Sequence, residues 1–435
     1  MLAPASVNQD QLMLADILED LKARGLMVQS TDEQVLAEHL QAQPRTLYCG
    51  FDPTADSLHI GNLVPLLVLK RFQLAGHRPI LLLGGATGLI GDPSGKSEER
   101  NLHDQQTVAG FVEKIRAQTK AFLSYEGDQG AIVVNNLDWT AQQDVVYFLR
   151  EIGKHFSVNM MMQRESIRAR LEREDQGISY TEFSYMLLQA NDFYELFNQY
   201  GCTLQVGGND QWGNIVSGVD LVRRKCEAQV HALTLPLITK ADGTKFGKTA
   251  GGSIWLDSAK TSPYTFYQFW LNTADADVVH YLKVFTLLPM AQIQDLEAAV
   301  AQAPGQRQAQ KRLAEEVTEL VHGPEAVAAA KRITEALFTG AVAELAESDL
   351  QSLQQDGMSA TQVSDERLGL LSLISSTGLA ASNGAARKLV ASGGVSVNGE
   401  KVTDPSLELD WTNALYGRFY VLRKGKKTWH LASRA

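Results

Sequence analysis

The sequence contains little cysteine. Only three cysteines occur in 435 residues, Cys49, Cys202 and Cys226, and they lie far apart. Their odd number and wide spacing argue against a disulfide framework, and they do not have the spacing of metal ligands. We therefore expect reduced thiols and no metal site held by the protein.

The sequence also lacks segments that would direct it to a membrane. No apolar run reaches the roughly 18–20 residues that a spanning helix needs. The N-terminus has neither the basic start nor the apolar middle of a signal peptide, and its acids (Asp10, Asp16, Glu19 and Asp20) are not typical of a transit peptide. A cytoplasmic protein without a membrane partner is expected.

An excess of positive charge is missing as well, since the net charge is −10. Nonspecific binding of nucleic acid by the whole surface is therefore not expected. From Gly378 to the end, however, nine Lys/Arg stand against four Asp/Glu, so that part is near +5 and the rest near −15. This asymmetry predicts that the C-terminal part meets a polyanion, although a solvated charged tail would have the same composition.

What the sequence does contain is an alternation of strands and helices. Strands are expected at 47–51 and 80–83, with a helix at about 60–73 between them. This βαβ pattern continues to about residue 233 and predicts an α/β fold with a doubly wound parallel (Rossmann-like) sheet, followed by an all-helical region and a small α+β region. The expected divisions are an N-terminal helical segment at 1–43, the Rossmann-like domain at 44–260, a helical domain at 261–340, a linker at 341–367 and a small domain at 368–435.

Two segments have the composition of an anion site. Residues 48–62 leave a strand and open a helix, where His59 can donate to a phosphate and Gly61 allows close approach of a ligand. Lys245 and Lys248 lie in a Gly/Thr-containing loop that suits a mobile clamp on pyrophosphate. Taken singly, each has a plainer explanation, because such a histidine is more often a helix cap or core residue and such a loop is more often solvated surface.

A glycine-rich stretch at 84–96 is a third candidate. Its glycines resemble a phosphate cradle, but their spacing is not that of a P-loop, and a tight structural turn explains them equally well. Lys96 and Arg100 stand at its end and just beyond it, where they could reach a phosphate. Residues 207–214 also leave a strand through two glycines and include Asp210, an acid suited to a ribose hydroxyl.

One helix is expected to line a pocket. Tyr185, Gln189 and Asp192 are spaced i, i+4 and i+7, which places them on one helical face. A polar stripe of this kind is usually the solvated side of a helix. The neighbouring residues are too apolar for a surface helix, however, so a pocket lining is the better interpretation.

The order of these segments resembles the class I aminoacyl-tRNA synthetases. His-Ile-Gly-Asn at 59–62 and Lys-Phe-Gly-Lys-Thr at 245–249 are similar to the two signatures of that class, usually written His-Ile-Gly-His and Lys-Met-Ser-Lys-Ser. The segments between them resemble the bacterial tyrosyl-tRNA synthetases, at 48–54, 91–96, 182–185 and 208–213. The resemblance runs from about residue 10 to the end. It implies an enzyme that activates L-tyrosine with ATP, releases pyrophosphate and transfers tyrosine to the 3′ end of tRNA(Tyr).

The resemblance also implies a role for each matching position. The substrate's phenolic hydroxyl would be held by Tyr48 and Asp192, its ammonium group by Asp92, Tyr185 and Gln189, and its carboxylate would lie near Gln211. The ATP site would be lined by Gly50, Asp52, Thr54, His59, Gly61 and Asn62, with Cys49, Gly208 and Asp210 around the ribose. The phosphates would contact Lys96, Arg100, Lys245, Lys248 and Thr249. A carboxylate attacks without a general base, so catalysis should rest on positioning and on stabilising phosphate charge, with Mg²⁺ accompanying ATP.

Asn62 departs from the class signature. It stands where the signature has a second histidine, and an asparagine can donate a hydrogen bond but cannot carry a positive charge. We expect the reaction to be retained at some cost in rate. Phe246 and Gly247 replace the signature's Met-Ser, whereas both lysines of the clamp are retained.

The C-terminal part is similar to the S-four RNA-binding module. A helix with Arg387 and Lys388 precedes an expected hairpin with an Asn-Gly turn at 398–399, which would present cations to an RNA backbone. A homodimer is implied by the family resemblance alone. Two alternatives remain open at this stage, a tryptophanyl-tRNA synthetase, for which Tyr48 and Asp192 are less suitable, and an inactive RNA-binding factor.

Overall fold

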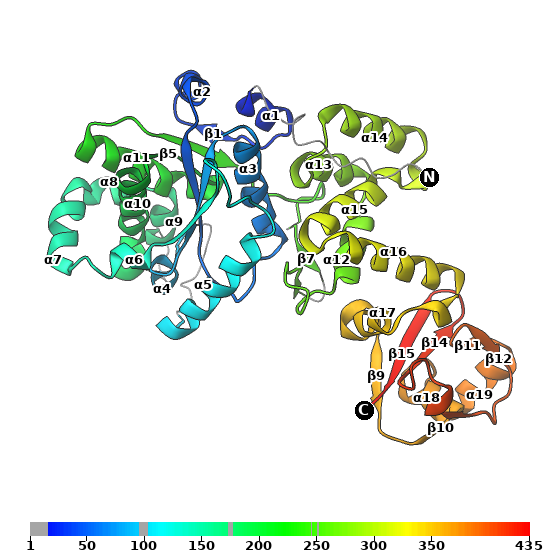
Figure 1. Cartoon of the computed structure of the whole chain (residues 1–435). Helices are drawn as coiled ribbons and strands as arrows, with labels where there is room; N and C mark the ends of the chain where they lie inside the picture. Colours follow the sequence, from blue (N-terminus) through cyan, green and yellow to red (C-terminus); the bar gives the residue numbers. More distant parts are fainter. Residues whose placement is uncertain (1–15, 95–102, 173–176, 245, 250–251) are drawn as a thin grey trace. The chain divides into compact units, whose positions relative to one another are not determined.

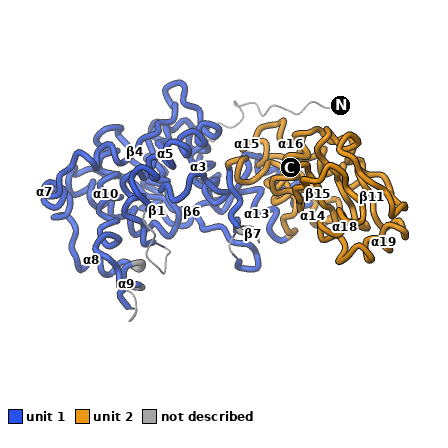
Figure 2. The backbone as a smooth tube through the Cα atoms, turned by 90° about the horizontal axis from the view of Figure 1, so that it is seen from below, with its two compact units in different colours: residues 1–256, 276–298 blue, residues 257–275, 299–435 orange. Residues whose placement is uncertain are grey.

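The computed structural model describes residues 16–94, 103–172, 177–244, 246–249 and 252–435 (Figure 1). The chain forms two compact units (Figure 2). Unit 1 comprises Met1–Leu256 with Ala276–Ala298, and unit 2 comprises Asp257–Asp275 with Ala299–Ala435. Within the described ranges, no helix is both long enough and apolar enough to cross a membrane.

Unit 1 is built on a six-stranded sheet in the order β1-β6-β5-β2-β3-β4. Neighbouring strands are parallel, except that β1 runs antiparallel to β6. The strands are β1 (Gln29–Ser30), β2 (Thr46–Phe51), β3 (Arg78–Leu83), β4 (Ile132–Asn135), β5 (Cys202–Gly208) and β6 (His231–Leu235). The chain proceeds from β2 outward in one direction and from β5 outward in the other, which confirms the doubly wound parallel sheet expected from the sequence.

Helices pack on this sheet and bury its apolar strands. α10 (Tyr180–Tyr200) and α11 (Trp212–Cys226) pack on the face that carries Tyr48 and Ile80. α3 (Leu63–Leu74) packs against β2, β3 and β5. The other elements that lie wholly or mostly in unit 1 are α1 (Ile17–Ala23), α2 (Glu33–Ala42), η2 (Ile60–Asn62), α4 (Thr87–Ile90), α5 (Gln105–Thr119), α6 (Leu137–Thr140), α7 (Val145–Tyr147), η3 (Phe148–Ile152), η4 (Gly153–His155), α8 (Val158–Met162), α9 (Glu165–Leu171), η5 (Asn209–Gln211), β7 (Lys248–Thr249), β8 (Gly252–Ser253), α13 (Asp275–Phe285) and α14 (Met290–Gln302).

Unit 2 contains a helical part and a small sheet. The helices α12 (Pro263–Leu271), α15 (Gln308–His322) and α16 (Pro324–Thr339) pack against one another. A five-stranded sheet has the order β12-β11-β14-β15-β9, in which β9 pairs with β15 in parallel and the other pairs are antiparallel. The remaining elements and strands are η6 (Pro304–Gln306), η7 (Val342–Glu344), α17 (Glu347–Ser352), η8 (Leu353–Gly357), β9 (Ala360–Val363), β10 (Arg367–Gly369), α18 (Leu370–Ser376), α19 (Asn383–Ala391), β11 (Val395–Val397), β12 (Glu400–Val402), β13 (Glu408–Asp410), η9 (Trp411–Asn413), β14 (Phe419–Lys424) and β15 (Thr428–Arg434).

Local structure differs from the sequence expectation in three places. The short β1 in the N-terminal segment adds an edge strand to the sheet, and two residues carry too little pattern to reveal it. The helix that continues the alternating pattern after β4 is irregular, with one α-helical turn at Val145–Tyr147 followed by a π-helical turn at Phe148–Ile152. Residues 341–367, expected to be a linker, include α17 and also β9, which pairs in the five-stranded sheet.

Candidate active site

A cleft of about 660 Å³ opens where β2 and β5 end, next to the point at which the strand order reverses. Open α/β sheets bind ligands at this place because the connections diverge there. Fifteen residues singled out in the sequence line the cleft. They are Tyr48, Cys49, Gly50, Asp52, Thr54, His59, Gly61, Asn62, Asp92, Tyr185, Gln189, Asp192, Gly208, Asp210 and Gln211.

The remaining candidates are not among the residues that line this cleft. Lys96, Arg100 and Lys245 lie outside the described residues. The backbone of Lys248 and Thr249 forms β7, which pairs with β8 in a short hairpin. Two further candidates, Arg387 and Lys388, are exposed on α19 of unit 2.

The buried end of the cleft is formed around Tyr48 and Asp192. Asp192 is 2% exposed, and its two oxygens accept hydrogen bonds from Trp139 Nε1 at 2.9 Å and from Asn136 Nδ2 at 3.0 Å. Burial raises the pKa of Asp192 to about 8, while these two donors act in the opposite direction. This end therefore holds one carboxyl group in a fixed orientation.

Tyr48 lies beside that carboxyl group with its hydroxyl still available. Its ring is fully buried against Phe193, with ring centroids 5.3 Å apart. The hydroxyl oxygen is buried and has no hydrogen-bond partner among the described residues. Burial, followed by the charge of Asp192, raises the pKa of Tyr48 well above its ordinary value, so the group remains a hydroxyl. A buried hydroxyl without a partner is costly, which suggests that a ligand completes this end.

Tyr185 connects the two ends of the cleft. Its hydroxyl donates to Asp52 Oδ2 at 2.7 Å, and the Thr87 hydroxyl donates to Asp52 Oδ1 at 2.7 Å. The chain passes close by at Gly84, where an added Cβ would lie 2.0 Å from Asp52 Oδ1. The glycine-rich stretch therefore needs a glycine here for packing, in agreement with the tight turn considered from the sequence.

A second set of hydrogen bonds is centred on the carboxylate of Asp92. Its oxygens accept hydrogen bonds from Gln211 Nε2 at 2.6 Å and from the Ser94 backbone N–H at 2.9 Å. Asn214 donates to Ser94 Oγ at 3.2 Å and so supports the same arrangement. Asp92, expected to bind a cation, and Gln211, expected near an anion, are thus held next to each other at the wall of the cleft.

The exposed end of the cleft begins at His59, which caps η2. His59 Nδ1 accepts a hydrogen bond from the Gly61 N–H at 3.1 Å, so in the neutral ring the proton is on Nε2. Asn62 Oδ1 accepts from the His59 N–H at 3.0 Å and completes a capping box. The side-chain amide oxygen of Asn62 is therefore engaged in the cap. The cap that the sequence left as the plainer explanation for His59 is present, and it leaves the residue exposed at the cleft.

Several residues of the site could not be recognised from the sequence motifs. Asn136 and Trp139 orient Asp192, Thr87 holds Asp52, and Asn214 supports the Asp92 group. Asn136 follows the carboxyl end of β4, and a polar residue directly after an apolar strand was the one available signal. Trp139 had no such signal, because its contact with Asp192 spans 53 residues.

In unit 2, the expected RNA-binding elements form. α19 starts at the Ser382 cap and has Arg387 and Lys388 on its exposed side. β11 and β12 form a hairpin whose turn places Asn398 and Gly399 at positive φ, 50° and 90°. Such values are required in a type I′ turn, so the Asn-Gly hairpin predicted from the sequence is confirmed.

Comparison with known families identifies two regions of the chain. Residues 40–339 match the family described as tRNA synthetases class I (W and Y). Residues 349–432 match the tyrosine–tRNA ligase SYY-like C-terminal domain. The two matches together span most of the chain.

Individual relatives carry the same description over nearly the full length. The chain is 57% identical over 418 residues to a tyrosine–tRNA ligase of Aeromonas hydrophila, and 55% identical over 417 residues to one of Dechloromonas aromatica, each covering 96% of this chain and 98% of the relative. A C-terminally truncated mitochondrial tyrosyl-tRNA synthetase of Aspergillus nidulans superposes with a TM-score of 0.68 at 30% identity, over 76% of this chain and 99% of that one. A tryptophanyl-tRNA synthetase of Encephalitozoon cuniculi shares the fold at 14% identity and a TM-score of 0.52.

Proposed function

The chain belongs to the tyrosine–tRNA ligases of the class I tRNA synthetases, and on this premise we propose how its residues carry out the reaction. The enzyme activates L-tyrosine with ATP, forming tyrosyl-adenylate and pyrophosphate, and then transfers tyrosine to the 3′ end of tRNA(Tyr). The observation that supports the site assignment best is the buried Tyr48 hydroxyl beside Asp192. A phenolic hydroxyl placed there could donate to Asp192 and accept from Tyr48, which phenylalanine and tryptophan cannot do.

The remaining polar groups of the substrate fit the hydrogen-bonded residues around Asp92 and Asp52. The ammonium group would lie between Asp92, Tyr185 and Gln189, where carboxylate, hydroxyl and amide oxygens can accept its three hydrogens. The carboxylate would lie near Gln211, whose amide donates to Asp92 in the present arrangement. These contacts fix the carboxylate oxygen for attack on the α-phosphate. Because the attacking group is already charged, the step needs positioning and no proton transfer.

ATP would occupy the exposed end. The backbone at Cys49 and Gly50, together with Asp52 and Thr54, would line the nucleotide, and Gly208 with Asp210 would contact the ribose. His59 Nε2–H and the Asn62 amide could donate to phosphate oxygens as charge builds up in the transition state. We also assign phosphate contacts to Lys96, Arg100, Lys245, Lys248 and Thr249. Mg²⁺ would enter with ATP, and among the described residues no group of three His, Cys, Asp or Glu could hold a metal ion.

The tRNA would also contact the C-terminal part of unit 2. Arg387 and Lys388 are exposed on α19, close in sequence to the β11–β12 hairpin that carries Lys401. Cations of this kind contact the phosphate backbone and position the RNA without reading its sequence. We propose residues 368–435 as the RNA-binding domain and residues 261–340 as a helical part on the anticodon side.

We further propose a homodimer located in the cytoplasm, where tRNA is charged. The support for a dimer is a set of exposed apolar side chains on and after α7 and on α8. Val145, Val146, Leu149, Val158 and Met160 are between 50% and 70% exposed. Large apolar side chains exposed on consecutive elements of the chain are the kind that an interface between proteins covers. Light scattering on the purified chain should give the mass of two chains, and a Val146→Asp, Met160→Asp variant should give the mass of one.

The reaction itself is tested by tyrosine-dependent ATP–pyrophosphate exchange with the purified full-length chain. We expect exchange with tyrosine, far slower exchange with phenylalanine or tryptophan, and charging of tRNA(Tyr). Absence of exchange with tyrosine, or equal exchange with phenylalanine, contradicts the proposal. RNA binding without any exchange would favour the inactive-factor alternative.

A further inference from the structure

One face of α13 holds the described part of the lysine loop, residues 240–249. Asp277 Oδ1 accepts a hydrogen bond from the Ala241 N–H at 2.7 Å. The ring of Phe246 stacks on Phe285 with centroids 5.0 Å apart, and it meets Tyr281 edge-on at 4.9 Å. Residues 277, 281 and 285 are each four apart, so they lie on the same face of the helix. α13 therefore contacts the loop both near its start and beside the clamp lysines.

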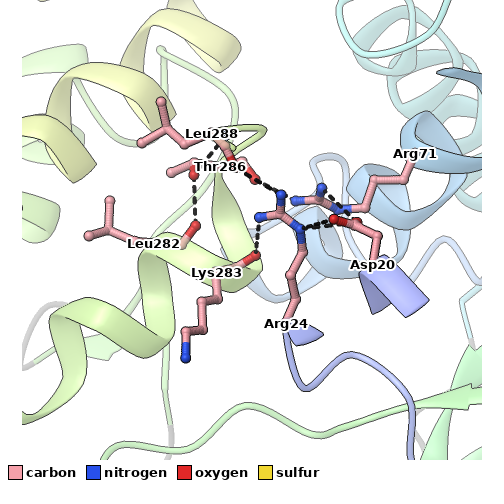
Figure 3. Close-up of polar contacts among 7 residues, drawn as sticks. All are labelled: Asp20, Arg24, Arg71, Leu282, Lys283, Thr286 and Leu288. Atoms are coloured by element: carbon pink, nitrogen blue, oxygen red, sulfur yellow. Dashed lines mark hydrogen bonds and ion pairs between the residues drawn. The ribbon is translucent and has the colours of Figure 1, made fainter. Parts of the chain in front are cut away.

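Two buried arginines donate hydrogen bonds to backbone carbonyls at the carboxyl end of this helix and just beyond it (Figure 3). Arg24 donates to the carbonyl oxygens of Lys283 at 3.2 Å and Leu288 at 2.8 Å. Arg71 donates to the carbonyl oxygen of Thr286. Lys283 is in the last turn of α13, whose carbonyls lack intrahelical partners and carry partial negative charge, and Thr286 and Leu288 directly follow the helix. The two guanidinium groups therefore satisfy carbonyls at this end and in the segment that leaves it.

A single carboxylate joins the two arginines. Asp20 accepts from Arg24 Nε at 2.8 Å and from Arg71 Nη1 at 3.3 Å. Both arginines are at most 2% exposed. Burial lowers the pKa of Arg71 to about 9, which leaves it charged at neutral pH. Two buried cations share one acid, so the helix-end carbonyls are needed to satisfy the remaining N–H groups.

Arg71 also belongs to the helix that starts at the nucleotide segment. η2 at Ile60–Asn62 leads directly into α3, and Arg71 lies in the last turn of α3. At the other end, a Cβ added to Gly247 would lie 3.1 Å from Ile60 Cγ1, so the loop touches the His59 segment there. The lysine loop thus lies against η2 directly and is also connected to it through α13, Arg71 and α3.

We propose that Arg24 and Arg71 are positioning residues for the nucleotide: by fixing the carboxyl end of α13 they set the place of Phe246, and with it the clamp loop, relative to His59. This inference rests on the proposed function, because the loop is assigned to the ATP phosphates. Arginine is required because its planar group can hold a carboxylate and a carbonyl at once, which a lysine ammonium on a flexible stem does poorly. The buried end of the cleft, at Tyr48 and Asp192, is not part of this connection.

The test compares Arg71→Lys, Arg24→Lys and Phe246→Leu in the full-length protein, with Arg45→Lys as a matched control. Arg45 also donates to a backbone carbonyl near the end of a helix, that of His39 in α2. We expect the first three variants to lower kcat/KM for ATP in pyrophosphate exchange by about tenfold or more, with tyrosine binding within about twofold of the unsubstituted protein. Arg45→Lys should change neither quantity by more than about twofold.

Two further readouts separate positioning from a general loss of folded protein. Trypsin should cut the folded protein faster at Lys240, Lys245 or Lys248 in the Arg71→Lys and Phe246→Leu variants, and not in Arg45→Lys. In the Arg71→Lys, Phe246→Leu double variant, the fold-loss in kcat/KM for ATP should be smaller than the product of the two single fold-losses. Both substitutions act on the same connection between α3 and the loop. The inference is overturned if Arg71→Lys keeps full exchange, if the losses multiply, or if tyrosine binding falls in parallel with exchange. An unsubstituted protein without exchange would instead refute the proposed function.

Discussion

The two ends of the cleft are built in different ways. At the buried end, Asp192 is oriented by Asn136 and Trp139, and Tyr48 is packed against Phe193. At the exposed end, His59 and Gly61 form a helix cap at the surface, and the loop that lies against Ile60 is held from α13. The first is a fixed set of buried polar groups, whereas the second depends on how a loop is positioned.

With the roles proposed for these residues, this difference makes recognition and catalysis separable. Buried groups with fixed partners can discriminate between substrates before any reaction, because an incorrect ligand leaves them unsatisfied. Groups that stabilise phosphate charge contribute mainly in the transition state. Changes at the buried end should therefore alter tyrosine binding and selectivity, and changes at the exposed end should alter the rate.

The largest effect is expected at the exposed end. His59→Ala removes the donor that we propose for the ATP phosphates and should lower kcat for tyrosine activation by about 100-fold or more. Its tyrosine affinity should stay within about twofold, since His59 is an exposed cap of η2 and makes none of the hydrogen bonds that orient Asp192. Pyrophosphate exchange and equilibrium tyrosine binding are measured on the same preparation. A parallel loss of tyrosine binding would contradict the separation of the two ends.

Asp192→Asn should have the next largest effect, and at the buried end. The substituted amide would face donors from Asn136 and Trp139 and could no longer offer two acceptor oxygens. An unpaired buried polar group costs about 1–3 kcal/mol, so tyrosine binding should weaken by about 10- to 100-fold. Phenylalanine, which has no hydroxyl, should bind nearly as before. If tyrosine and phenylalanine were weakened equally, Asp192 would not be the partner of the hydroxyl.

Trp139→Phe sharpens the same point with a smaller change. The variant keeps a large ring and removes the one indole N–H that orients Asp192. Loss of a single hydrogen bond to this buried carboxyl group should weaken tyrosine binding by up to about tenfold. ATP binding should be unchanged. Equal losses for both substrates would indicate that the ring supports the whole cleft and does not act through Asp192.

The smallest effect concerns stability in acid and should leave both ends of the cleft unchanged. Burial lowers the pKa of His39 and His77 to about 4, from an ordinary value of 6.5. The unfolded chain therefore binds more protons than the folded one between these values, so this contribution is complete above pH 6.5 and is lost as pH falls toward 4. The melting temperature should fall over this range, and less so in a His39→Gln, His77→Gln variant. If the melting temperature of the variant fell just as steeply with pH, His39 and His77 would not be the cause of the acid destabilisation.

The fold and the lining of the cleft could be predicted from the sequence because each is encoded locally. The apolar strands at 47–51 and 80–83 and the polar face of Tyr185, Gln189 and Asp192 follow from patterns a few residues long. The residues at the ends of β2 and β5 meet at one cleft because strands of a parallel sheet end at the same edge, and the polar face of α10 adds to its lining. The resemblance to a known family added the roles, which spacing alone leaves open.

Contacts between distant segments could not be predicted in this way. Trp139 reaches Asp192 across 53 residues, and Arg71 reaches the Thr286 carbonyl across 215. An arginine in an apolar helix suggests an ion pair but does not name its partner, and a backbone carbonyl leaves no trace in the sequence. The supports of both ends therefore became visible only in the structure.

Calorimetric titration with tyrosine and with phenylalanine in the absence of ATP tests the central claim most directly. If the buried end is already formed in the absence of nucleotide, tyrosine should bind without ATP and phenylalanine should bind far more weakly. Adding a non-hydrolysable ATP analogue should leave the ratio of the two affinities unchanged. Selectivity that appears only when the nucleotide is present would show that the two ends act together, and it would contradict the account.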